Sequence, residues 1–169
     1  MGADEAGLTR SQRMELEELA ARFVLGDQFR PEEAVGLAAR LVAAGIDGDG
    51  LVELASQPAD STKLSGFEVE RLLRATLAEL GLPVPSRDSA AWTTARWIAT
   101  AIVDGVIAPG EGARRLWSLS GECGHPGELV EMLQLEEAWE ESVGSDREAA
   151  EAAIVAFAPE VIAAADRRA

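Results

Sequence analysis

The sequence has very few of the side chains on which most enzyme and metal chemistry depends. Its 169 residues include one histidine (His125), one cysteine (Cys123) and no tyrosine. An internal disulfide needs a second cysteine, and zinc normally needs four Cys, His or carboxylate ligands in spaced pairs. Neither glycine-rich phosphate motif occurs, whether GxxxxGK followed by Ser or Thr, or GxGxxG. We therefore predict no catalytic residue, no metal ligand and no cofactor.

Long apolar runs and basic residues are scarce as well. No apolar run approaches the roughly 20 residues that cross a bilayer. The first ten residues, MGADEAGLTR, are acidic where a signal peptide carries basic residues. One lysine and fourteen arginines face thirty acids, which gives a formal net charge of −15. Because phosphate binding depends on Lys and Arg, we expect neither nucleic acid nor a membrane among the partners.

This balance indicates a cytoplasmic protein whose partner is another protein, and the acidity favours a basic one. The excess of acid is concentrated toward the carboxyl end, where residues 122–166 hold twelve Asp and Glu against a single arginine, Arg147. Frequent arginine and alanine are typical of GC-rich bacterial genomes, so we expect a bacterial source. The sequence leaves the oligomeric state open.

The fold class follows from composition and periodicity. Alanine and leucine are abundant, and unbranched side chains keep more rotamer freedom on a helix than β-branched ones. No stretch alternates with the period of two that is typical of a strand. We predict an all-α protein of seven to eight helices, with helices near 10–25, 31–45, 51–57, 67–80, 89–103, 109–119, 129–143 and from 145 onward. We expect a break near Gln134, a capping box formed by Ser145 and Glu148, and a kink or split of the last helix at Pro159.

The central stretch is Ser89–Leu119, which holds three of the four tryptophans. It is predicted to be a helix, a short loop and a second helix. Gly105 can adopt the left-handed conformation that ends a helix, and Pro109 suits the first turn of the next. An apolar stripe at helical spacing predicts that the first helix buries Trp92, Ala95, Ala99, Ile102 and Val103.

Shifting the chain by 78 residues aligns several features with themselves, which indicates an internal duplication. Pro31 then meets Pro109 at the start of a helix, and Leu51-Val52-Glu53 meets Leu129-Val130-Glu131. Chance alignment of alanine-rich helices remains the alternative. We predict a loose tail (1–10), a first helical unit (11–82), a proline-containing connector (83–88) and a second unit (89–169) packed with the first as one domain.

Two short stretches resemble metal-binding loops but lack ligands. In the Asp47-Gly-Asp-Gly50 turn, a calcium loop would place Gly45 and Ser56 where carboxylates are required. A helix-capping turn explains the same residues. Cys123 and His125 have no second Cys or His to complete a zinc site. His125 is also the single imidazole for any nucleophile, so an enzyme, using His125 or paired carboxylates, is an alternative rather than the prediction.

The strongest candidate surface is a run of acids in the predicted helix 129–143. Like charges four residues apart repel, so selection for a function is one reason to keep them, and solubility is another. We expect the acids on one exposed face, with Leu135 and Trp139 buried behind it. The candidate partner-binding residues are Glu136, Glu137, Glu140 and Glu141, together with Trp92 and Arg96, which are spaced so that the guanidinium could stack on the indole.

Taken together, the sequence predicts a non-enzymatic, acidic, helical protein-interaction module of a bacterial cytoplasm. One alternative is an immunity or inhibitor protein that neutralises a basic toxin such as a nuclease. The other is the enzyme described above.

Overall fold

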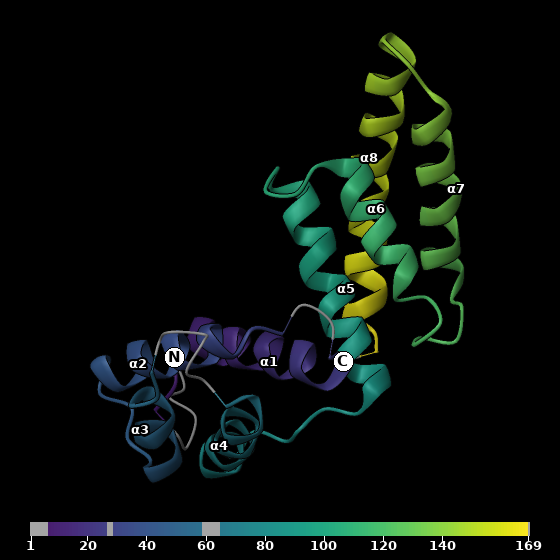
Figure 1. The fold of residues 1–169 in the computed structure, drawn as a ribbon. Coiled ribbons are helices and arrows are strands. Elements are labelled where there is room, and N and C mark those ends of the chain that lie inside the picture. Colours follow the sequence, from purple (N-terminus) through teal and green to yellow (C-terminus); the bar gives the residue numbers. More distant parts are fainter. Residues whose placement is uncertain (1–6, 27–28, 59–64, 169) are drawn as a thin grey trace. The chain divides into compact units, whose positions relative to one another are not determined.

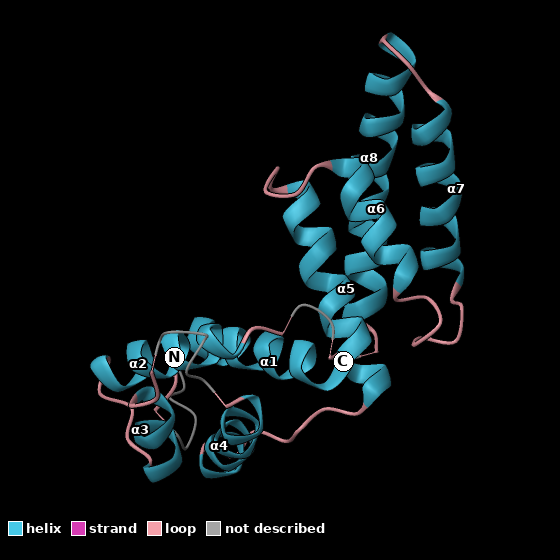
Figure 2. Ribbon diagram, viewed as in Figure 1, coloured by secondary structure: helices cyan, strands magenta, loops and turns pink. Residues whose placement is uncertain are grey.

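The computed structural model describes residues 7–26, 29–58 and 65–168. Within these ranges the chain forms eight α-helices and no strand, which confirms the predicted all-α fold (Figure 2). The helices are α1 (Arg10–Leu25), α2 (Pro31–Ala43), α3 (Asp49–Ala55), α4 (Gly66–Glu79), α5 (Arg87–Val103), α6 (Pro109–Ser118), α7 (Gly127–Glu141) and α8 (Ser145–Asp166).

Several helices begin and end where local chemistry predicts. The Thr9 hydroxyl accepts a hydrogen bond from the backbone N–H of Gln12, and the Thr9 N–H donates to the Gln12 side chain, so α1 starts with a capping box. Gly26, with φ of 72°, ends α1 in the left-handed region. Pro31 and Pro109 occupy the first position of α2 and α6, where a missing N–H is harmless.

Two local expectations in the second half are wrong, and a third is wrong in part. The capping box predicted for Ser145 and Glu148 is absent, because Ser145 already lies inside α8 and Gly144 is the N-cap. Helix α7 is not broken near Gln134. Helix α8 continues through Pro159 rather than splitting there. A 22-residue helix whose inner face is buried stays folded after the loss of one backbone hydrogen bond, because tertiary packing supplies most of its stability.

The chain divides into two compact units at the Ser86–Arg87 junction, which lies inside the predicted connector. In unit 1, α3 packs between α2 and α4, while α1 touches α2 and α4 at few places. Leu16, Leu19 and Ala20 of α1 are buried. The rest of this core includes Leu37, Leu41, Leu51, Leu54, Val69, Leu72, Leu73 and Leu77. That the units pack as one domain stays a prediction.

In unit 2, α5 packs along α8, α6 packs on α7, and α7 and α8 run side by side as a hairpin (Figure 1). The predicted stripe of α5 is buried except for Val103, which is 45% exposed because it lies in the last turn before the loop. Fully buried side chains of the neighbouring helices close the core: Leu116, Leu129, Met132, Ile154 and Val161.

Corresponding helices of the two units begin at similar intervals. The starts of α1 and α5, α2 and α6, α3 and α7, and α4 and α8 are 77, 78, 78 and 79 residues apart. Buried side chains recur at the same offset of 78, as in the pairs Leu51 and Leu129, and Leu54 and Met132. Both observations support the duplication, which stays a prediction.

Thr76 is an exception within the apolar core of unit 1. Its side chain is fully buried in α4, and its hydroxyl oxygen has no hydrogen-bond partner among the described groups. Replacing Thr76 by the isosteric Val removes an unsatisfied polar atom, so we expect the free energy of unfolding to rise by about 1 kcal/mol. Urea denaturation measures the change. Thr76→Ser, which keeps the hydroxyl and loses the methyl group, should be less stable than wild type. A Val variant below wild type would show that the hydroxyl has a partner in solution.

Candidate interaction site

The acidic run of α7 does not form a single exposed face. Glu136 is 7% exposed and lies on the core stripe of the helix, four residues after Met132 and seven after Leu129. Those spacings place all three side chains on one side of an α-helix. The expectation that Glu136 belongs to an outer acidic surface is therefore wrong. The expectation failed because the sequence suggested that the buried face of α7 runs through Leu135, whereas the buried face runs through Leu129, Met132 and Glu136.

A single arginine pairs with two of the four acids, the buried Glu136 and the exposed Glu140. The Arg114 guanidinium lies 3.1 Å from a Glu136 carboxylate oxygen and 2.5 Å from one of Glu140. Hydrogen bonds to Glu140 and then to Glu136 raise the pKa of Arg114 above its ordinary value. These contacts fasten α7 to α6. Glu136 is a buried carboxylate that needs a charged partner, and the exposed Glu140 adds a second ion pair at the surface.

Trp139 joins three helices rather than lying behind an acidic face. Its ring is half-buried against the backbone of Gly110, and its indole N–H donates to Glu151 at 3.1 Å. The Arg147 guanidinium stacks on the ring, 3.9 Å from its centroid. Leu135 is also half-buried, so neither side chain is fully enclosed as predicted.

Glu137 and Glu141 are exposed as well, but they belong to a different surface. Glu137 and Glu141 lie in the last two turns of α7, and Asp146 and Glu148 lie in the first turn of α8. Between them, in the connecting loop, Val143 is 77% exposed. No ion pair is recorded for these four acids among the described residues. We call these five residues the acidic tip. It forms the free end of the α7–α8 hairpin, beyond the start of α6 (Figure 1).

Trp92 and Arg96 lie away from this tip and have internal contacts. Trp92 is 2% exposed, and the cation that stacks on it is Arg168, 4.3 Å from the ring centroid, rather than Arg96 as predicted. Arg96 instead forms an ion pair with Asp166 at 3.1 Å. Both side chains therefore hold α5 against the carboxyl end of α8.

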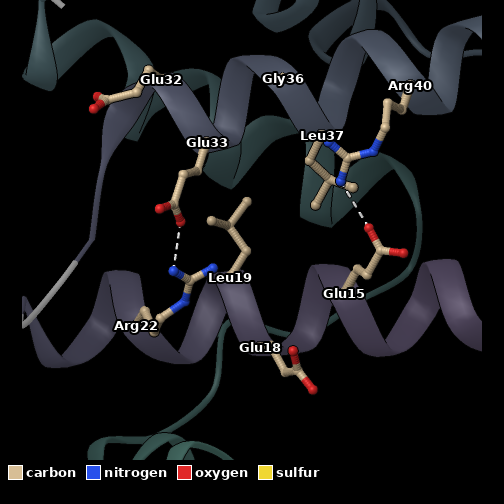
Figure 3. Close-up of a pocket in the computed structure, with 9 residues that line it drawn as sticks. All are labelled: Glu15, Glu18, Leu19, Arg22, Glu32, Glu33, Gly36, Leu37 and Arg40. Atoms are coloured by element: carbon tan, nitrogen blue, oxygen red, sulfur yellow. Dashed lines mark hydrogen bonds and ion pairs between the residues drawn. The ribbon is translucent and has the colours of Figure 1, made fainter. Parts of the chain in front are cut away.

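A groove between α1 and α2 is a feature that the sequence analysis missed. It has a volume of about 400 Å³, and the side chains along it are mostly charged (Figure 3). An ion pair joins the two helices toward each end: Glu15 with Arg40 at 2.8 Å, and Arg22 with Glu33 at 2.5 Å. The sequence signal was present, because each helix carries Glu and Arg seven residues apart.

Comparison with protein-family models, with curated proteins and with solved structures finds no match to this chain. Inferences about function therefore depend on the geometry of its own side chains. Across the described residues, no helix combines the length and the apolar character needed to cross a membrane.

The Asp47–Gly50 turn has a structural role, although the cap differs from the predicted one. Both carboxylate oxygens of Glu79, the last residue of α4, lie 2.9 Å from the backbone nitrogen of Gly50 in α3. The Asp47 carboxylate accepts from the adjacent Gly48 N–H. No cluster of three or more His, Cys, Asp or Glu side chains suited to a metal occurs among the described residues.

The His125 loop holds two potential nucleophiles, Ser120 and Cys123. The Ser120 hydroxyl lies 3.4 Å from Nδ1 of His125, a long contact, and Ser120 is 2% exposed. Cys123 is half-buried, and burial followed by repulsion from Asp88 raises its pKa to about 12. A thiol with that pKa is almost fully protonated at neutral pH, and a buried serine is closed to substrate, so neither group is activated for attack.

Proposed function

We propose that the protein is a non-enzymatic interaction module whose acidic tip docks on a basic protein surface. The proposal keeps the setting predicted from the sequence, the cytoplasm of a bacterium. The observation that carries it is the division of the acids in α7 and α8. Glu128, Glu136, Glu140, Glu151 and Asp166 are engaged by Arg or Trp partners. The acids of the tip have no such partner among the described residues. Glu131 and Glu160 have none either, but they lie in the halves of α7 and α8 that are away from the tip, whereas the four tip acids lie together at one end of the hairpin.

The chemistry of the tip suits a basic partner. Exposed carboxylates attract a positively charged surface over distances of about 8 Å at physiological salt, which accelerates encounter more than it tightens the final complex. The exposed Val143 side chain adds an apolar contact at the centre of the acids. An apolar centre within a charged rim is the usual composition of a small docking surface.

Neutralising the tip tests this proposal. Decalysine serves as the probe, and the variant carries Glu137→Gln, Glu141→Gln, Asp146→Asn and Glu148→Gln. We expect its affinity for decalysine, measured by isothermal titration calorimetry at low salt, to fall on the order of tenfold, because four exposed charge contacts are lost. Circular dichroism should show unchanged helix content, since the four side chains make no recorded ion pair.

A matched control separates docking at the tip from general attraction to an acidic protein. It carries Glu17→Gln, Asp47→Asn, Asp104→Asn and Glu160→Gln, four exposed acids outside the tip. Both variants have the same net charge, but the control should bind decalysine within about twofold of wild type. Equal losses in the two variants would show that the tip is only a solvated surface. Inhibition of a basic toxin is a narrower form of the same proposal, and no observation on the structure selects it.

A further inference from the structure

Four charged side chains form two ion pairs across the α1–α2 groove. Glu15 and Arg22 are seven residues apart on α1, as are Glu33 and Arg40 on α2. Seven residues are about two helical turns, so each pair lies on one face of its helix. The helices run in opposite directions across the groove, and each Glu therefore meets the Arg of the other helix (Figure 3). We call these four residues the charge latch.

Helix α1 buries fewer side chains than its counterpart in unit 2. Four residues of α1 are buried, whereas α5 buries eight. The groove of about 400 Å³ lies between α1 and α2, and Gly36, which has no side chain, is among the residues that line it. Fewer buried residues mean that less apolar area is exposed when α1 leaves than when α5 does.

The end groups of α1 are satisfied by hydrogen bonds within the helix and its caps. Its capping box satisfies backbone groups at the amino end, and at the carboxyl end the Gly26 N–H donates to the carbonyls of Arg22 and Phe23. These bonds lie within α1 and its caps. The left-handed Gly26 is the position at which the chain can turn without steric strain.

We propose that α1 is a detachable strap, and that the charge latch sets how often it opens. Leu16, Leu19 and Ala20 return it to the core of unit 1, and the two ion pairs hold it across the groove. The latch side chains are between 23% and 65% exposed, so dissolved salt reaches and screens them. Opening is local, precedes unfolding of the rest of unit 1, and becomes more frequent as ionic strength rises.

Hydrogen exchange measured by mass spectrometry tests the strap on the full chain. Amides of residues 10–25 should exchange faster than those of α4, and raising NaCl from 50 to 500 mM should accelerate them about threefold to tenfold, with less than a twofold change in α4. Exchange of α1 and α4 at one common rate, unaffected by salt, would overturn the proposal, because α1 would then open only by global unfolding.

Reversing charges distinguishes the latch from a general effect of salt. Arg40→Glu places two carboxylates together and should accelerate α1 exchange by about tenfold. Adding Glu15→Arg restores an attractive pair with the order reversed, and exchange should return to within about threefold of wild type. A double variant that exchanges as fast as the single one would contradict the latch. If the single variant does not fold, the salt series on wild type and the double variant decide the question.

Discussion

Replacing Gly110 by Ala should destabilise the protein, although alanine is the better helix former. A Cβ atom at Gly110 would lie 2.4 Å from two carbons of the Trp139 ring and 2.6 Å from a third. The ring cannot move aside freely, because Arg147 stacks on it and Glu151 accepts its N–H. Overpacking of this kind outweighs the gain in helix propensity, so we expect the free energy of unfolding to fall by about 1–3 kcal/mol.

The same substitution at another helical glycine provides the control. At Gly36, in α2, the atom nearest to an added Cβ is the flexible end of Arg40 at 4.0 Å. Gly36→Ala should therefore stabilise the protein by about 0.4–1 kcal/mol through the unfolded chain. Urea denaturation of both variants measures the contrast. If both shift stability in the same direction, Trp139 does not lie against α6 as described.

Truncating Leu54 or Met132, which are buried at corresponding positions of α3 and α7, should lower the free energy of unfolding most strongly. Leu54 in α3 and Met132 in α7 are 1% and 0% exposed, and they stand 78 residues apart. We expect Leu54→Ala and Met132→Ala each to lower the free energy of unfolding by about 2–5 kcal/mol, because each leaves a cavity that neighbouring helices cannot fill. Chemical denaturation, with hydrogen exchange to locate the loss, is the measurement.

The location of each loss tests the division into two units. If each unit opens cooperatively by itself, exchange should accelerate chiefly within unit 1 for Leu54→Ala and within unit 2 for Met132→Ala. Met132→Leu is the control. It conserves the side-chain volume, so it should shift the free energy of unfolding by less than about 1.5 kcal/mol. A Met132→Ala variant as stable as wild type would show that α7 does not bury this face.

Interactions between residues close in sequence were sufficient to predict the fold class and most helix ends. Caps such as Thr9 with Gln12, and proline at the first helical position, act through bonds between near neighbours. Pro159 shows the limit of that reasoning. A proline that disfavours an isolated helix is tolerated where packing on α5 supports the turns on either side.

The candidate surface was harder to predict because it depends on partners from distant parts of the chain. Nothing near Glu136 in sequence indicates that Arg114, 22 residues earlier, would draw it inward. Likewise, the pairing of Glu15 with Arg40 needs α1 and α2 to lie antiparallel, which the spacing of seven residues suggests only once the helices are placed. Three of the four acids predicted for the surface, Glu137, Glu140 and Glu141, are exposed, and Glu136 alone is buried.

The most direct test of the account is a residue-by-residue map of where a basic ligand binds. Decalysine would be titrated into the isotopically labelled protein, and backbone amide chemical shifts followed by NMR at 50 mM salt. The account predicts shifts concentrated in residues 137–148, centred on Val143, which weaken sharply at 500 mM salt as the exposed charges are screened. Shifts spread evenly over the acids of both units, or absent from the acidic tip, would contradict it.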